Sequence, residues 1–278
     1  MKKIIVVLLA VVVIGVLAFT FFSDSEDCLE YVKIKLTDEK YAFAVNKENP
    51  ELLEKVNSVI KKIKENGELE KITEKYFAEE TEKYNPVASA HRDSTKKQLV
   101  VATSTPFKPF EFSKYESGTG KQYMGIDIEI AAIIARELGC ELVIKELDFI
   151  EVISAVENNE ADIAMAGLSK SESRQEHVNF SDSYYSASQV LIVKCGNDTF
   201  EDCESKKDVE KILSSLGSDT KISYQTHTTS GDYLKPYNIS AQGYDSAVLA
   251  AQAVLDGDVD FALVDEGAAK IIIKDMNN

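Results

Sequence analysis

A helical segment with a wide apolar face and no partner of its own constrains this fold most. Asn49 and Pro50 are a typical N-cap and first helical residue. Apolar residues then recur at helical spacing, at Leu52, Leu53, Val56, Val59, Ile60 and Ile63. Gly67 ends this helix, and a second short helix carries Leu69, Ile72, Tyr76 and Phe77. Nothing within 49–77 can cover so much apolar surface, so we expect this hairpin to pack against a distant part of the chain.

Strand and helix patterns alternate in the rest of the chain. Residues 78–97 are polar, contain Pro86 and have no sustained period, so we interpret them as a linker. From Leu99 onward, strands such as LVVAT, ADIAMAG and FALVD alternate with helices such as IDIEIAAIIARELG, for which Asp127 is the expected N-cap. Two short strands, YVKIKL and YAFAV, precede the hairpin. This alternation predicts an α/β fold with parallel sheets covered by helices.

The composition excludes several classes of function. The 278 residues carry a net charge of −16 at pH 7, a surface that the phosphates of nucleic acid would repel. The three histidines are scattered, and no group of cysteines and histidines has the spacing of metal ligands. We therefore expect no nucleic-acid partner, no metal and no cofactor.

The first residues are predicted to lie outside the folded part. Met1 and two lysines precede an unbroken apolar run from Ile4 to Phe22, which is long enough to cross a bilayer as one helix. The lysines are expected to stay in the cytoplasm, which places everything after Ser23 outside. The pattern for signal cleavage is poor, so we favour an uncleaved membrane anchor, with a cleaved signal segment as the alternative. Acidic residues before Cys28 argue against lipid attachment there.

The remaining cysteines give weaker indications. Cys195 and Cys203 flank a short polar loop that would lie outside the membrane, where a disulfide could persist. The sequence does not decide whether this disulfide forms. Cys140 is interpreted as a small core residue.

Several separated stretches resemble the extracellular solute-binding proteins of polar amino-acid ABC importers. VVATSTPFKPFEF is similar to that family's first strand and aromatic loop, DIAMAGLSKSESRQEHVNFSDSYY to its most recognisable block, and DVDFALVDEGAA to a pocket strand of the second lobe. The stretch from DEKYAFAV to EKITEKYF looks like the family's end, yet here it precedes the first strand. The resemblance implies a two-lobed type 2 periplasmic-binding-protein fold with two crossing hinge strands, circularly permuted.

The permuted order implies a division of the chain into six segments. These are a membrane segment at 1–23, the first part of lobe 2 at 24–41, the last helices of lobe 1 at 42–77, the linker at 78–97, the main part of lobe 1 at 98–188, and the main part of lobe 2 at 189–278. The helices from Pro50 to Phe77 should then pack on the lobe that contains Leu99–Ser183, with YVKIKL beside the other lobe. The rival interpretation is a leftover fragment of a decayed tandem fusion.

A site for a free amino acid needs a cation for the carboxylate and an anion for the ammonium. Arg174 is the candidate cation, because a guanidinium matches a carboxylate in bidentate fashion. Asp265 ends an apolar strand, where a carboxylate needs a partner, although capping the next helix is the alternative role. The resemblance implies that Ser169 and the carbonyl of Gly167 complete the ammonium shell. Thr229, before a helix, would offer its N–H and hydroxyl to the carboxylate.

The resemblance also assigns the pocket for the ligand side chain. Phe107 and Phe149 match the family's stacking aromatics, although composition alone would place both in the core. Ser104 stands where many relatives carry an aspartate, which weakens the case for lysine or arginine. Ser104 and Gln225 could hydrogen-bond an amide instead. Phe110 is expected to pack in the core, and Glu111 is expected not to discriminate between ligands. The ligand is therefore predicted only as a polar amino acid.

The predicted function is binding without covalent chemistry. Two lobes would close over the amino acid, and the closed form would deliver it to an ABC transporter permease at the extracellular face of the membrane. We expect a monomer and no enzymatic activity. Two alternatives stay open: an amino-acid-sensing receptor domain, and an enzyme similar to prephenate or arogenate dehydratases, with Glu266 or Glu151 as the acid.

Overall fold

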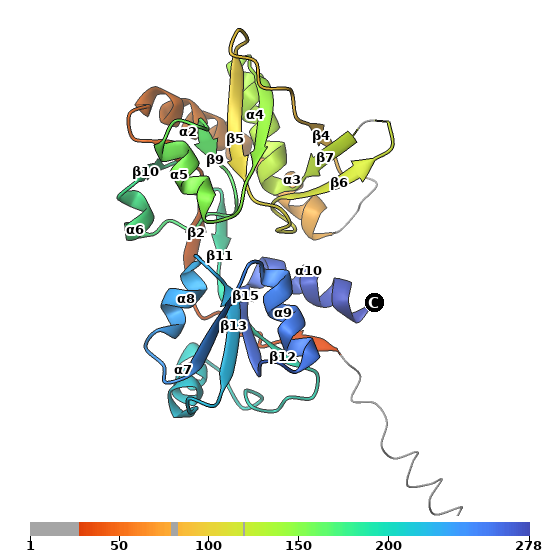
Figure 1. Cartoon of the computed structure of the whole chain (residues 1–278), viewed down its shortest axis with the longest axis vertical. Helices are drawn as coiled ribbons and strands as arrows, with labels where there is room; N and C mark the ends of the chain where they lie inside the picture. Colours follow the sequence, from red (N-terminus) through yellow and green to blue (C-terminus); the bar gives the residue numbers. More distant parts are fainter. Residues whose placement is uncertain (1–27, 79–82, 119) are drawn as a thin grey trace, which may run out of the picture.

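Two five-stranded sheets organise the chain, and helices cover each sheet to form a lobe (Figure 1). The computed structural model describes residues 28–78, 83–118 and 120–278. The sheet of lobe 1 contains, in spatial order, β10 (Val178–Phe180), β3 (Ala44–Asn46), β9 (Ile163–Ala164), β5 (Gln98–Thr103) and β8 (Glu141–Glu146). Its helices are α2 (Pro50–Glu65), α3 (Glu68–Phe77), α4 (Ile126–Leu138), α5 (Glu151–Glu157) and α6 (Glu172–Gln175).

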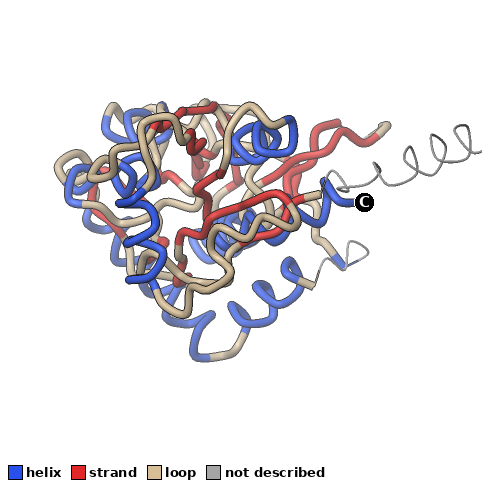
Figure 2. Tube along the Cα trace, turned by 90° about the horizontal axis from the view of Figure 1, so that it is seen from below, coloured by secondary structure: helices blue, strands red, loops and turns tan. Residues whose placement is uncertain are grey.

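Lobe 2 repeats this plan with other segments. Its sheet contains β1 (Leu29–Tyr31), β12 (Gln189–Lys194), β15 (Phe261–Asp265), β13 (Lys221–Gln225) and β14 (Ser240–Tyr244). Its helices are α7 (Lys206–Ser215), α8 (Thr229–Leu234), α9 (Ala247–Asp256) and α10 (Glu266–Asn277). In Figure 2 strands pass through the middle of the molecule between helices, and one pair of strands projects at the upper right.

Two short antiparallel strands, β2 (Glu39–Tyr41) and β11 (Tyr185–Ala187), run between the lobes (Figure 1). The chain continues from β2 into β3 of lobe 1 and from β11 into β12 of lobe 2. Both entering strands pair in antiparallel fashion, β3 with β9 and β12 with β15. The expectation of parallel sheets is therefore correct only for the three strands at one side of each sheet, β8-β5-β9 and β14-β13-β15.

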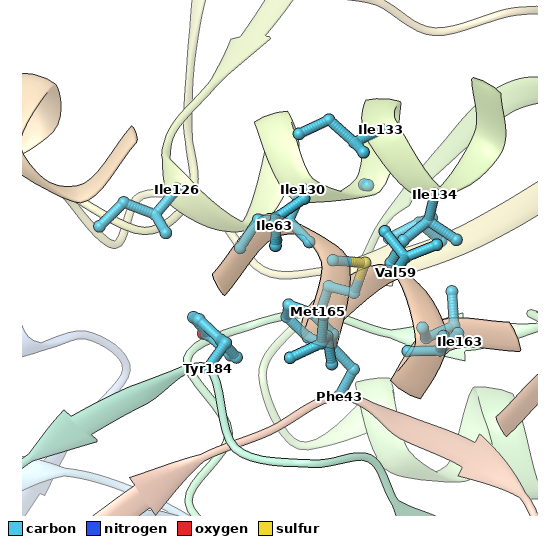
Figure 3. Packing of buried hydrophobic residues seen from close by; sticks show 14 of the residues in the cluster. Phe43, Val59, Ile63, Ile126, Ile130, Ile133, Ile134, Ile163, Met165 and Tyr184 are labelled. Carbon is cyan, nitrogen blue, oxygen red and sulfur yellow. The ribbon is translucent and has the colours of Figure 1, made fainter. Parts of the chain in front are cut away.

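The apolar hairpin finds its partner in lobe 1. The side chain of Asn49 accepts a hydrogen bond from the Leu52 N–H at 3.1 Å and caps α2. Both α2 and α3 contact α4, which begins only at Ile126. Val59 and Ile63 of α2 share a buried core with Ile130 and Ile134 of α4 (Figure 3). One face of the lobe 1 sheet is thereby covered by α2, α3 and α4, while α5 packs on the other face.

The first described residues belong to lobe 2. Strand β1 pairs with β12, with Leu29 opposite Lys194, so that Cys28 and Cys195 come next in register. These two cysteines form a disulfide, with 5.5 Å between their Cα atoms. The suggested Cys195–Cys203 bridge is therefore wrong, and Cys203 is a free thiol, as is Cys140. Beyond β1, the N–H groups of Val32 and Leu36 still bond to carbonyls of β12.

Some local predictions differ from the structure. Asp127 does not cap α4, because Gly125 occupies the N-cap position and the Asp127 side chain turns inward. A hairpin of β6 (Phe112–Glu116) and β7 (Gly120–Met124) forms where no strands were expected. The strands β11 and β12 follow each other closely, with only Ser188 between them.

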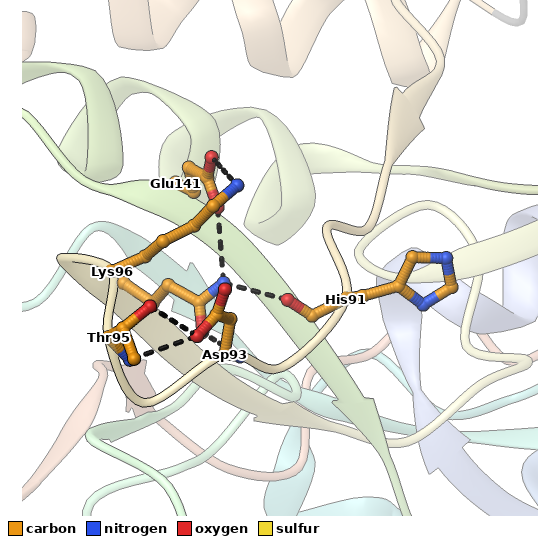
Figure 4. A network of polar contacts seen from close by, with 6 residues as sticks. His91, Asp93, Thr95, Lys96 and Glu141 are labelled. Atoms are coloured by element: carbon orange, nitrogen blue, oxygen red, sulfur yellow. Dashed lines mark hydrogen bonds and ion pairs between the residues drawn. The ribbon is translucent and has the colours of Figure 1, made fainter.

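The described part of the linker is attached to lobe 1. Its strand β4 (Val87–Ala88) pairs with β7. The loop after β4 is held by side chains that Figure 4 shows: Lys96 Nζ lies 2.7 Å from Glu141 Oε1, and Asp93 accepts two hydrogen bonds from Thr95. Gln98 donates to the His91 carbonyl at 2.7 Å. Residues 83–97 are thus part of the lobe 1 surface.

The predicted membrane segment from Ile4 to Phe22 lies outside the described residues. Among the helices that the structure describes, none is long and apolar enough to cross a membrane.

The Cys28–Cys195 disulfide closes a loop with a sequence separation of 167 residues, so it should stabilise the fold by restricting the unfolded chain. We expect the Cys28→Ser, Cys195→Ser double variant to lose about 2–5 kcal/mol of unfolding free energy in urea. The parent in reductant should lose as much. Cys203→Ser is the control and should have little effect. Equal stability of the double variant and the parent would contradict this assignment.

Candidate functional site

A hollow of about 500 Å³, open solvent at its mouth included, lies between the two lobes. It is bordered by the carboxyl ends of β5, β13 and β15, the position where ligands bind in open α/β sheets. All nine residues expected from the sequence line it: Ser104, Phe107, Phe149, Gly167, Ser169, Arg174, Gln225, Thr229 and Asp265. Both lobes contribute, so the site is complete only when the lobes face each other.

Arg174 lies at the boundary between the lobes. Ser171 caps α6 by accepting from the Arg174 N–H, which fixes the start of the side chain. Nη1 donates to the Ser169 carbonyl at 2.9 Å, and Nη2 donates to the His227 carbonyl of lobe 2 at 3.1 Å. The guanidinium lies 5.4 Å from the centre of the Phe149 ring. No carboxylate of the described residues forms an ion pair with Arg174, so its positive charge is available to an anionic ligand.

Asp265 places a carboxyl group in the same hollow. It precedes α10, but its side chain makes no capping hydrogen bond and accepts one from the Tyr41 hydroxyl instead. Burial raises the pKa of Asp265 to about 7, and the negative charge of Glu39 adds to this effect. The Tyr41 hydrogen bond and the charge of Arg174 act in the other direction. An ammonium group in contact with Asp265 would compensate the ionised carboxylate.

Gly167 brings the backbone close to the aromatic wall of the hollow. Its φ of +54° is unfavourable for other residues, and a Cβ there would lie 2.6 Å from the Phe107 ring. The Gly167 N–H donates to Asp127 Oδ2 at 3.0 Å. The inward turn of Asp127 therefore positions the Gly167 backbone, which explains why this acid is buried instead of capping α4. Burial raises its pKa to about 7.

Phe107 and Phe149 have different neighbours. Phe107 stacks on Phe110 with ring centres 5.5 Å apart and contacts the cores of both lobes. Phe149 packs against the core beside α5 and faces Arg174. Phe110 is almost fully buried, as the sequence predicted.

The crossing strand β2 contributes two residues to which the sequence analysis gave no role in the site. Tyr41 donates to Asp265, as described above, and is itself buried. Glu39 accepts hydrogen bonds from the hydroxyls of Ser169 and Thr229, one from each lobe. Ser169 was expected beside a ligand ammonium, but its hydroxyl donates to a carboxylate here.

Two further acids line the hollow. Glu111 is 1% exposed, and neither of its carboxylate oxygens has a hydrogen-bond partner within the described part of the chain. Burial and the charges of Asp127 and Asp265 raise the pKa of Glu111 well above its usual range. Asp245, in the loop between β14 and α9, is exposed. The family resemblance gave no reason to single out Asp245, and it treated Glu111 as a general feature.

A sequence profile of the bacterial extracellular solute-binding proteins, family 3, matches residues 5–79 and 99–264. The chain belongs to this family of two-lobed binding proteins. ArtP, an arginine-binding extracellular protein of Bacillus subtilis, is 32% identical over 102 residues, which are 37% of this chain and 38% of that protein. Cyclohexadienyl dehydratase of Pseudomonas aeruginosa is 26% identical over 176 residues, which are 62% of this chain and 61% of the enzyme.

Solved structures show the same fold. An ancestral arginine-binding protein bound to arginine has a TM-score of 0.56 at 29% identity, over 66% of this chain and 76% of that one. The chain spans less than two thirds of the length of ArtP and of the dehydratase in these alignments.

The raised pKa of Asp265 predicts a pH-dependent stability. Between about pH 4 and 7 the native state holds a proton that the unfolded chain has released, so the free energy of unfolding should fall as pH rises through this window. Asp265→Asn keeps an acceptor for Tyr41 and removes this titration. In urea unfolding, the free energy of unfolding of this variant relative to the parent should increase by roughly 1–3 kcal/mol from pH 4 to pH 8.

Asp245→Asn is the matched control, because Asp245 lines the same hollow but is exposed. Its stability difference from the parent should stay constant over this range. An equally constant difference for Asp265→Asn would show that Asp265 ionises normally in the native state.

Proposed function

We propose that this chain captures a free polar α-amino acid between its lobes and delivers it to an ABC importer. The observation that carries the proposal is the pair of Arg174 and Asp265 in one interlobe hollow, where the guanidinium donates to two backbone carbonyls and to no carboxylate of the described residues. A zwitterionic amino acid complements this pair of charges. Membership in the solute-binding family supports the same function.

Each part of the ligand is assigned a partner. The carboxylate binds Arg174 in bidentate fashion, together with Thr229 at the start of α8. The ammonium binds Asp265 and the Gly167 carbonyl. The sequence analysis expected the Ser169 hydroxyl to face the ligand ammonium. We assign it instead to the ligand carboxylate, because this hydroxyl already donates to a carboxylate, that of Glu39.

The ligand side chain extends between Phe107 and Phe149. Ser104 and Gln225 offer hydrogen bonds to its polar end, and both line the same hollow.

Hinge closure follows from this division of partners. Lobe 1 supplies Arg174 and both aromatic rings, while lobe 2 supplies Thr229 and Asp265. Since neither lobe holds all the partners of the amino acid, ligand binding favours the closed arrangement about β2 and β11. The closed form is the one that the permease would recognise.

The proposal places the protein as a monomer at the extracellular face of the membrane. The apolar segment 4–22 would anchor it there, or would be cleaved on export. A sensing receptor domain would use the same site and differ only in its partner.

An enzyme is the other class to consider, because one relative is named a dehydratase. The two acids that the sequence offered for catalysis do not line the hollow. Glu266 forms ion pairs with Lys35 at 3.1 Å and Lys270 at 2.8 Å, and Glu151 is the exposed first residue of α5. Neither Glu266 nor Glu151 is therefore placed to act on a ligand in the hollow.

Removing the guanidinium tests the site. Calorimetry against the twenty standard amino acids should find a ligand for the parent, and Arg174→Ala should weaken its binding by about 2–5 kcal/mol, or at least roughly thirtyfold. Arg136→Ala, at an exposed position on α4, is the control. If both variants bind as the parent does, Arg174 does not hold the carboxylate. Turnover of prephenate by the parent would instead favour the enzyme.

We also propose that the chain is a circular permutation of its family's fold. The hairpin of α2 and α3 packs in lobe 1 although it precedes every element of that lobe except β3, and the family profile matches in two stretches. The Leu29 N–H donates to Asn277 Oδ1 at 2.9 Å, and Asn277 Nδ2 donates to the Leu29 carbonyl at 2.8 Å. Residues 28 and 278 can therefore be joined by a short linker without displacing either lobe.

A rearranged chain tests the permutation. Residues 83–278, followed by a short linker and residues 28–78, should fold and bind the same amino acid as the parent, because every packed contact is retained. Residues 83–278 alone should not fold, since α4 would expose the surface that α2 covers. Circular dichroism and calorimetry measure both results. A folded, ligand-binding 83–278 fragment would favour the leftover-fragment interpretation.

A further inference from the structure

The side chain of Glu39 connects the two lobes through a single carboxylate oxygen. Its Oε2 accepts hydrogen bonds from the Ser169 hydroxyl of lobe 1 and from the Thr229 hydroxyl of lobe 2, the latter at 2.9 Å. Its Oε1 accepts from the Thr37 hydroxyl at 2.8 Å. Glu39 lies on the crossing strand β2, opposite Ala187 of β11, so it is anchored at the hinge itself.

The two hydroxyls that hold Glu39 belong to the carboxylate end of the hollow. Ser169 and Thr229 both line it, and the Ser169 carbonyl accepts from Arg174 Nη1 at 2.9 Å. Hydroxyls that converge on one carboxylate oxygen beside a guanidinium provide the surroundings that an α-carboxylate needs. We propose that Glu39 is an internal substitute for the α-carboxylate of the ligand, and that it sets the affinity of the site. This inference rests on the proposed amino-acid function.

Two carboxylates cannot use the same hydroxyl pair. When the α-carboxylate of the ligand binds, Glu39 must move away from these hydroxyls. It then loses two charge-assisted hydrogen bonds, and this loss lowers the affinity for the ligand. The Thr37 hydroxyl accepts a hydrogen bond from the Gln189 N–H at 2.9 Å and donates to Glu39 Oε1. This second contact keeps Glu39 close to the hollow. The negative charge of Glu39 therefore opposes the ligand carboxylate before and after displacement.

Glu39 also affects the lobes when no amino acid is bound. Since its Oε2 holds one hydroxyl from each lobe, it favours their approach. Loss of this carboxylate should shift the ligand-free protein toward a more open arrangement. Ligand affinity should nevertheless rise, because the competing anion has been removed.

The chain offers a matched control next to Glu39. Asp38 lies one residue earlier, points to Lys40 at 2.8 Å and is fully exposed to solvent. Asp38→Asn removes the same charge from the same segment without touching the hydroxyl pair. Glu39→Gln keeps the shape of the side chain and removes its charge.

The test titrates the parent, E39Q and D38N with the standard amino acid that the parent binds most tightly, and with the α-carboxamide of that amino acid. E39Q should bind the amino acid roughly tenfold more tightly than the parent does, as expected for loss of one competing charged hydrogen-bond acceptor. It should show no gain for the carboxamide, which has no α-carboxylate. D38N should match the parent with both ligands.

Several outcomes would overturn the inference. If E39Q binds the amino acid as D38N does, or gains equally for the carboxamide, Glu39 does not compete with the α-carboxylate. Small-angle X-ray scattering gives a readout without ligand, in which Glu39→Ala should have a larger radius of gyration than the parent and D38N. An unchanged radius would refute the contact between the lobes. A parent that binds none of the twenty amino acids would refute the proposed function and this inference together.

Discussion

The burial of the α2 apolar face against α4 is the constraint from which the rest of the arrangement follows. Five buried aliphatic side chains on α2 need a partner, and the structure supplies it from a helix that the chain reaches only after residue 125. Because the hairpin must join lobe 1 while β1 pairs in lobe 2, the chain has to pass between the lobes before α2. Strand β2 makes that passage, and β11 makes the return.

The position of β2 in turn shapes the chemistry of the hollow. Tyr41 and Glu39 lie on this strand and reach Asp265 and the pair of Ser169 and Thr229. The hinge is therefore more than a connection, since its side chains contact the groups to which we assign the ligand. The hollow concentrates acids around a single guanidinium, and the raised pKa values of Asp265 and Glu111 follow from their burial among like charges.

Much of this arrangement could be predicted from the sequence. The 3.6-residue spacing of the α2 stripe and the alternation of elements after Leu99 indicated the helices and the α/β class. Asp127 shows where the helix-capping rule fails. An aspartate near a helix start is a good capping residue, but this one accepts a hydrogen bond from the Gly167 N–H instead. The disulfide partner of Cys195 depended on the register of the three-residue strand β1, which no pattern in the sequence specifies.

For the candidate site, the family resemblance brought together residues that line one hollow. Glu39, Tyr41 and Asp245 were missed because their relation to the hollow depends on how the lobes face each other. Periodicity and spacing describe one element at a time, and they carry no information about that juxtaposition.

The Cys28–Cys195 bond also has a mechanical consequence. Tension applied to the chain ahead of Cys28 enters the sheet of lobe 2 at a covalent crosslink, and the hydrogen bonds between Leu29 and Asn277 attach the same point to α10. The load is thus distributed over β12 and α10 before it reaches β2. A pull from that side would displace lobe 2 as one body and leave the hinge unloaded, so lobe 1 could still open and close under strain.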